Sequence, residues 1–121
     1  MKEITIIEDD RITQFLLKTL LLKEGYIVNC VMDGKEILEK KSLFSVDLVI
    51  LDIMMPNMYD SAKLISVYQN ITAPIIVMSS MDKSDGIYFT KKINAESYFT
   101  KPLDHRDIIN EVNDILSSVN I

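Results

Sequence analysis

Residues 47–52 read Asp-Leu-Val-Ile-Leu-Asp, which is four consecutive apolar residues between two acids. A short apolar run without polar–apolar alternation is typical of a strand that is buried on both faces of a parallel sheet. Residues 74–78, Pro-Ile-Ile-Val-Met, form a second run of this kind. The two runs therefore predict two central strands in a sheet whose faces are both covered by helices.

Around these runs, shorter strand-like stretches alternate with helical patterns. Residues 4–7, 26–31 and 97–100 predict three further strands. Asp10 and Asp104 stand where they can cap helices, and the apolar residues after each of them recur at helical spacing. Parallel strands need crossover connections, and these are right-handed. We therefore predict an α/β fold with a five-stranded parallel sheet and five helices that lie on both faces.

The helical pattern is weakest over residues 82–94. Gly86 and Thr90 lower the helix propensity there, because glycine and β-branched residues lose more conformational freedom in a helix than alanine does. We nevertheless predict that this stretch forms the fourth helix.

Length and composition limit the classes of function. The chain has 121 residues, so we expect residues 1–121 to form a single domain. A net charge of −5 argues against direct nucleic-acid binding, which needs a basic face. The single cysteine, Cys30, excludes an internal disulfide and suits a reducing cytosol. No apolar stretch reaches the roughly 18 residues of a membrane span, and the start does not resemble a signal peptide, so we expect a cytoplasmic protein without membrane contact.

Polar side chains stand at the carboxyl ends of four predicted strands, which is where sites form in open α/β sheets. They are Glu8-Asp9-Asp10 after the first strand, Asp52 at the end of the third, Ser79-Ser80 at the end of the fourth and Thr100-Lys101-Pro102 at the end of the fifth. Each has an ordinary explanation by itself, since such acids cap helices, serines form turns and lysines are usually solvated. Their equivalent positions in the fold favour one shared site.

The chemistry of this set is consistent with phosphoryl transfer. Clustered carboxylates raise one another's pKa unless a cation joins them, and Mg²⁺ prefers carboxylate, phosphate and water oxygens. Asp52 can act as a nucleophile and form an acyl phosphate. Lys101 can neutralise charge on the transferred group, and Ser79 can donate a hydrogen bond to one of its oxygens.

Four segments in order resemble the receiver domains of two-component response regulators, over residues 4 to about 119. The segments are Ile-Ile-Glu-Asp-Asp at 6–10, Asp-Leu-Val-Ile-Leu-Asp-Ile-Met-Met-Pro at 47–56, Pro-Ile-Ile-Val-Met-Ser-Ser at 74–80 and Tyr-Phe-Thr-Lys-Pro-Leu at 98–103. The resemblance implies a flavodoxin-like, doubly wound sheet with strand order 2-1-3-4-5. The chain resembles the stand-alone, chemotaxis-regulator-like type of receiver.

The same resemblance implies a phosphoacceptor and a metal site. Asp52 would accept the phosphoryl group in a Mg²⁺-dependent reaction, with Mn²⁺ as an alternative ion. Asp9 and Asp52 would bind the metal, Glu8 would assist through water, and the backbone carbonyl of Met54 would complete the protein ligands. Asp10 would lie outside the ligand set and cap the first helix.

The resemblance also implies a switch. Lys101 would pair with Asp52 or with the phosphoryl group, and the bond from Lys101 to Pro102 would be cis. Ser79 would be the hydroxyl that moves toward the phosphoryl group, and Tyr98 the aromatic residue that swings inward with it.

Two departures from the family pattern concern glycine. Residues 55–61, Met-Pro-Asn-Met-Tyr-Asp-Ser, form a loop one residue longer than usual, and the glycine that normally eases its turn is missing. Asn94 replaces the glycine common before the fifth strand, a mild change because asparagine tolerates the left-handed conformation.

The expected partners are a sensor histidine kinase or phosphotransfer protein and an output protein that binds the fourth helix, fifth strand and last helix. Homodimerisation on phosphorylation is a further expectation, and the protein would catalyse only its own phosphorylation and dephosphorylation.

A constitutive binding module is an alternative, motivated by the altered loop. A phosphatase acting on outside substrates would need a second acid at Met54, and a flavin protein would need a hydroxyl- or glycine-rich loop where Glu8-Asp9-Asp10 stands.

Overall fold

The computed structural model describes residues 1–39, 45–53 and 61–118. Within these ranges, five strands form one parallel sheet in the order β2-β1-β3-β4-β5. The strands are β1 Glu3–Ile7, β2 Ile27–Val31, β3 Leu48–Asp52, β4 Ile75–Ser79 and β5 Ser97–Thr100. The expected flavodoxin-like strand order is therefore confirmed, with the two continuous apolar runs as central strands.

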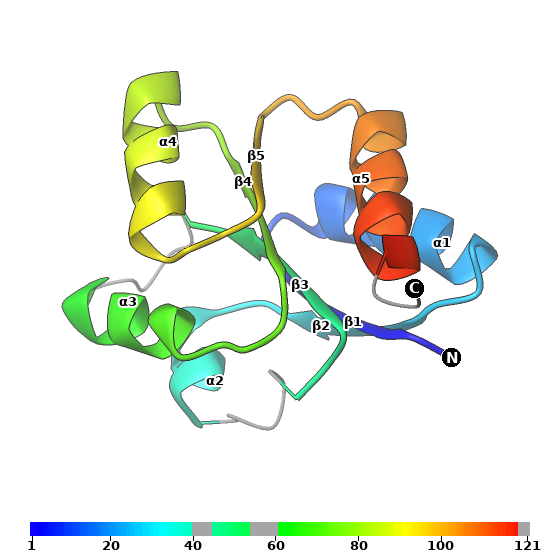
Figure 1. Ribbon diagram of the computed structural model, residues 1–121, viewed down its shortest axis with the longest axis horizontal. Coiled ribbons are helices and arrows are strands. Elements are labelled where there is room, and N and C mark those ends of the chain that lie inside the picture. The colour runs from blue at the N-terminus through cyan, green and yellow to red at the C-terminus, as the bar shows by residue number, and fades with distance from the viewer. Residues whose placement is uncertain (40–44, 54–60, 119–121) are drawn as a thin grey trace.

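Helices cover both faces of this sheet (Figure 1). They are α1 Arg11–Lys23, α2 Gly34–Glu39, α3 Ser61–Gln69, α4 Lys83–Lys92 and α5 His105–Ser118. Figure 1 shows α1 and α5 together on one side, and α2, α3 and α4 on the other. None of the helices in the described ranges has both the length and the apolar character needed to cross a bilayer.

Among the described residues, buried apolar side chains form two core clusters, one on each face of the sheet. Every residue of β3 and β4 is buried, as the continuous apolar runs predict. Alternate residues of β3 point to opposite faces, so Leu48 and Ile50 pack with α1 and α5, whereas Val49 and Leu51 pack with α2, α3 and α4. Asp52, the last residue of β3, is thus held on a strand that is buried throughout.

Local signals explain where several helices begin and end. The Asp10 carboxylate accepts a hydrogen bond from the Thr13 N–H at 3.1 Å and caps α1, and Asp104 accepts one from the Arg106 N–H at 3.0 Å before α5. Gly25 follows α1 with a φ of +93°, a conformation that glycine adopts readily. Asn94 has a φ of 58°, so it takes the left-handed conformation that its position requires.

Candidate functional site

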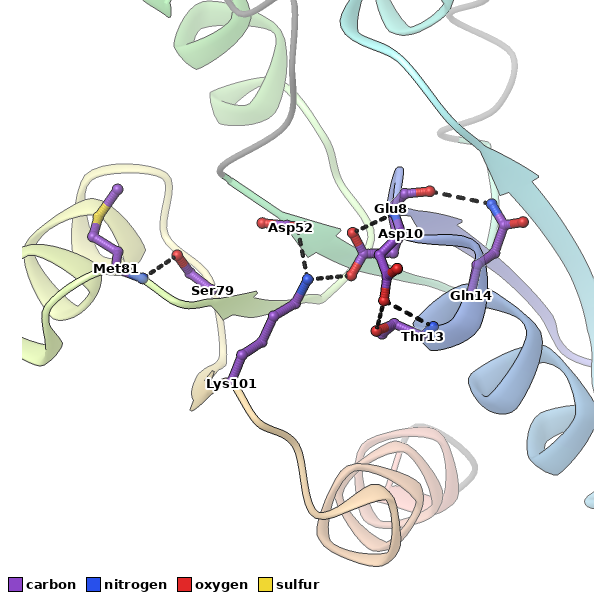
Figure 2. Close-up of polar contacts among 8 residues, drawn as sticks. All are labelled: Glu8, Asp10, Thr13, Gln14, Asp52, Ser79, Met81 and Lys101. Carbon is purple, nitrogen blue, oxygen red and sulfur yellow. Dashed lines mark hydrogen bonds and ion pairs between the residues drawn. The ribbon is translucent and has the colours of Figure 1, made fainter.

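The carboxyl ends of four strands bring the predicted site residues to one edge of the sheet (Figure 2). Glu8 directly follows β1, Asp52 ends β3, Ser79 ends β4 and Lys101 directly follows β5. The strand register aligns Asp52 with Met78 and Ser79 with Thr100, so these strands end almost level with one another. The sequence argument placed these residues together, and the structure does the same.

Lys101 connects two buried acids. Its ammonium nitrogen lies 2.5 Å from Oε1 of Glu8 and 2.9 Å from Oδ2 of Asp52. Glu8 is fully buried and Asp52 is 3% exposed. Figure 2 shows the lysine side chain reaching from the end of β5 to the space between the two carboxylates. The pair with Asp52 agrees with the expectation from the sequence, whereas the pair with Glu8 was not predicted.

The missed contact between Glu8 and Lys101 has a simple geometric origin. β1 and β3 are neighbours, with Ile7 aligned to Leu51, so Glu8 and Asp52 stand at adjacent positions on one edge. A lysine long enough to reach Asp52 from β5 can therefore also reach Glu8. The strand order allows this contact without deciding it, and the sequence argument assigned Glu8 to the metal alone.

Burial and charge perturb the titration of this cluster. The pKa of the Glu8 carboxyl is raised to about 7, chiefly by burial and next by the neighbouring Asp52, while the hydrogen bond from Lys101 lowers it. Burial also disfavours the charged form of Lys101, but its hydrogen bonds and ion pairs with Glu8 and Asp52 outweigh this, so the pKa of Lys101 is raised. One ammonium group cannot neutralise two carboxylates, and an excess of negative charge remains at the site.

Three acids form a set that fits a hard divalent cation. Glu8, Asp9 and Asp52 each offer a carboxylate oxygen, and these oxygens lie within 4.8 Å of one another. All the donors are oxygen, as Mg²⁺ requires. Burial is the main cause of the raised pKa of Glu8, and the neighbouring Asp52 adds to it, so a cation beside these carboxylates would favour their charged forms. Met54, whose backbone carbonyl was expected to be a further ligand, lies outside the described residues, as do residues 55–60 of the unusual loop.

Asp10, the third acid after β1, has a different task. Its carboxylate accepts hydrogen bonds from both the N–H and the hydroxyl of Thr13. These bonds lower the pKa of Asp10 and hold its side chain on α1. The geometry therefore agrees with the expectation that Asp10 caps the first helix.

A second group of contacts lies on the α4 side of the site. The Ser79 hydroxyl oxygen accepts a hydrogen bond from the Met81 N–H at 2.9 Å, and Figure 2 shows this side chain directed toward Met81. The Tyr98 hydroxyl donates to the Met81 carbonyl at 3.2 Å. Ser79 and Tyr98, expected to act together, are thus joined through one residue. The peptide bond from Lys101 to Pro102 is cis, as expected.

The sequence profile of the response regulator receiver domain matches residues 4–113. This chain belongs to the receiver domain family. It is 30% identical over 116 residues to the transcriptional regulatory protein CpxR of Escherichia coli K12, a match that covers 96% of this chain and 50% of that protein. It is 31% identical over 120 residues to the response regulator ArlR of Staphylococcus saprophyticus, covering 96% and 53%.

Solved structures support the same fold. A two-component response regulator from Clostridium difficile superposes with a TM-score of 0.85 at 23% identity, covering 100% of both chains. The receiver domain described here spans about half the length of the curated relatives it matches. What those relatives do as whole proteins is therefore a separate question from what this domain does.

Proposed function

We propose that this receiver domain is a phosphorylation switch that accepts a phosphoryl group on Asp52 from a sensor histidine kinase or a phosphotransfer protein. The observation that carries the proposal is the Asp52 carboxylate, buried at the end of the central strand β3 and paired with Lys101 at 2.9 Å. Family membership supports the assignment.

In the proposed reaction, a carboxylate oxygen of Asp52 attacks phosphorus while the bond from phosphorus to the donor's imidazole nitrogen breaks. The imidazole keeps the electron pair, and the product is an acyl phosphate. Lys101 fixes the orientation of the acceptor and brings positive charge beside the transferred group. The chain thereby catalyses its own phosphorylation, and later hydrolysis, without acting on outside substrates.

Glu8, Asp9 and Asp52, with the Met54 carbonyl that the family pattern adds, would hold Mg²⁺ or Mn²⁺. Such a cation neutralises charge on the phosphoryl oxygens. Within the chain itself, Glu8 positions Lys101 through their 2.5 Å ion pair and accepts a hydrogen bond from the Asp10 N–H at 3.2 Å. These contacts place the acids before any ligand arrives.

The conformational response would pass through Ser79 and Tyr98. A phosphoryl group adds charge and acceptor oxygens at Asp52, and Ser79 at the end of the adjacent strand β4 is placed to respond. Any change in its hydroxyl contact with Met81 bears on Tyr98, which donates to the same residue. An output protein would read this change on α4, β5 and α5, where Ile87 and Tyr88 of α4 are exposed by 37% and 67%.

Acetyl phosphate labelling, followed by intact mass measurement with and without Mg²⁺, tests the acceptor. Wild type should gain one phosphoryl group only with Mg²⁺, and Asp52→Asn should gain none. Asp10→Asn is the matched control, since an exposed acid two residues after Glu8 changes while its capping role is retained by asparagine. Labelling of Asp52→Asn would refute the assignment of the acceptor.

A constitutive binding module is the second candidate, favoured by the long, glycine-free loop at 55–61. It predicts no phosphoryl adduct under any condition and no spectral change with beryllofluoride. A cytoplasmic location, homodimerisation on phosphorylation and the assignment of residues 1–121 to one domain stay predictions.

A further inference from the structure

Gly86 lies in the middle of α4 and is buried. Glycine is a poor helix former, and it was the residue that made this stretch the weakest helical pattern in the chain. Gly25 occupies a positive φ that favours glycine, but the positive-φ residues do not include Gly86, which lies within the α4 helix. Its lack of a side chain therefore needs another explanation.

The Tyr98 side chain supplies that explanation. A Cβ atom placed on Gly86 would lie 2.6 Å from Cε2 of Tyr98 and closer still to its Cζ and hydroxyl oxygen. Atoms that are not bonded cannot approach so closely. The end of the tyrosine ring thus fills the space that any other residue at position 86 would occupy.

The contact between Gly86 and the Tyr98 ring also bears on the hydrogen bonds that join Tyr98 to Ser79. The Tyr98 hydroxyl donates to the Met81 carbonyl at 3.2 Å, and the Met81 N–H donates to Ser79 at 2.9 Å. Tyr98 also packs against the core cluster on the α2–α4 side. The glycine is therefore the point at which the contacts running from Ser79 reach α4.

We propose that Gly86 is a positioning residue of the switch, because its missing side chain forms the slot on α4 in which the Tyr98 ring lies. This inference rests on the proposed function of Ser79 and Tyr98. A methyl group at position 86 expels the ring, since the ring end is the movable partner and the helix backbone is not. The hydrogen bond from Tyr98 to the Met81 carbonyl is then lost, and Ser79 is uncoupled from α4.

A double-mutant cycle tests the steric part of the proposal. Gly86→Ala, Tyr98→Ala and the double variant are compared with wild type by thermal unfolding. In the Tyr98→Ala background, Gly86→Ala should raise Tm by about 4 °C, because alanine is the better helix former and nothing is in its way. In the wild-type background the gain should vanish or reverse. Equal gains in both backgrounds would overturn the proposal.

Folding failure would also be informative. If Gly86→Ala alone does not fold, restoration of folding by Tyr98→Ala supports the steric account. If the double variant does not fold either while Tyr98→Ala does, position 86 has another role and the proposal is wrong.

Unfolding measurements do not report on the connection between Ser79 and α4, so the contact between Tyr98 and Met81 must be measured directly. In protein with labelled tyrosine, proton NMR should show close contacts from the Tyr98 ring to Gly86 and Met81. In Gly86→Ala the contact with Met81 should disappear, whereas Lys91→Ala, an exposed change on the same helix, should preserve it. An unchanged contact between Tyr98 and Met81 in Gly86→Ala would contradict the proposal that Gly86 positions the ring.

Beryllofluoride separates this inference from the proposed function. The ion should bind Gly86→Ala as it binds wild type, but only wild type should keep the Tyr98 ring beside Met81. Failure of wild type to bind the ion would count against phosphorylation at Asp52, while the ring contacts measured without it would still decide the role of Gly86. A ring that stays beside Met81 in both proteins would refute the role of Gly86.

Discussion

The two sides of the site are built differently. On the α1 side, Glu8 is buried, pairs with Lys101, accepts from the Asp10 N–H and accepts from Gln14 through its carbonyl. On the α4 side, among the described residues, the Ser79 hydroxyl accepts a hydrogen bond from the Met81 N–H and the Tyr98 hydroxyl donates one to the Met81 carbonyl. Figure 2 shows the denser set of contacts around Glu8 and the single contact between Ser79 and Met81.

The helices on the two sides, α1 and α4, also differ in how firmly they are held. α1 has 13 residues, a side-chain cap from Asp10 and buried leucines at 17 and 21. α4 has 10 residues, and its buried positions are Gly86 and Thr90. Low local stability is expected of elements that move, so the comparison suggests a fixed α1 side that holds ligands and a movable α4 side that responds.

The largest expected effect on stability concerns the ion pairs of Lys101 with Glu8 and Asp52. Lys101→Met should reduce the free energy of unfolding by about 3 kcal/mol in metal-free protein, because it leaves two buried carboxylates without their ammonium partner. Urea unfolding at neutral pH measures this loss. The exposed Lys91→Met provides the control and should change little. Similar stabilities of the two variants would mean that Lys101 does not stabilise the acid cluster.

A pH dependence of nearly the same size is expected from Glu8. Its pKa rises from 4.5 to about 7 on folding, so the folded protein holds this proton more tightly than the unfolded chain does. The resulting stabilisation is complete below about pH 4.5 and is lost as the pH rises through 7, by about 3 kcal/mol in total.

Unfolding of wild type and Glu8→Gln between pH 4.5 and 7.5, without divalent metal, measures this difference. Wild type should lose stability relative to Glu8→Gln as the pH rises, and Mg²⁺ should restore it at the upper end. Parallel curves for the two proteins would show that Glu8 titrates normally.

A smaller effect should separate α1 from α4 directly. Gly86 and Thr90 together lower the intrinsic stability of α4 by about 1.5 kcal/mol compared with alanine. Native-state hydrogen exchange should therefore show that amides of α4 open with a lower free energy than those of α1. Equal protection of the two helices would contradict the view that α4 is less stable than α1.

The smallest effect concerns the helix starts. Asp10 caps α1 with its side chain, whereas Asp82 precedes α4 and, among the described residues, makes no capping hydrogen bond with its side chain. Asp10→Ala should therefore lower Tm measurably, and Asp82→Ala should leave it nearly unchanged. An equal loss in both variants would contradict this view of the two helix starts.

The sequence predicted those features that depend on pattern along the chain. The apolar runs of β3 and β4 gave the central strands, and the rule that strand ends converge brought Glu8, Asp52, Ser79 and Lys101 together. The Asp10 and Asp104 caps and the left-handed Asn94 followed from local chemistry in the same way.

Features that depend on side-chain placement across the fold were not predictable. Gly86 read only as a weak point in a helix, because the position of Tyr98 twelve residues later depends on a side-chain conformation that the sequence pattern does not contain. The second partner of Lys101 was missed for the same reason. Pattern places residues on strands and edges, but it does not say which of two nearby acids a flexible ammonium will reach.

The spacing of the charged residues along the chain also affects how the protein is made. Glu8, Asp52 and Lys101 come from the first, middle and last parts of the sequence. During synthesis, β1 and β3 can pair long before the ribosome has produced Lys101, and their ends then carry two crowded acids without a counter-charge. Burial of these acids should therefore wait for β5. The last strand to be synthesised would complete the sheet and its charge balance in one cooperative step.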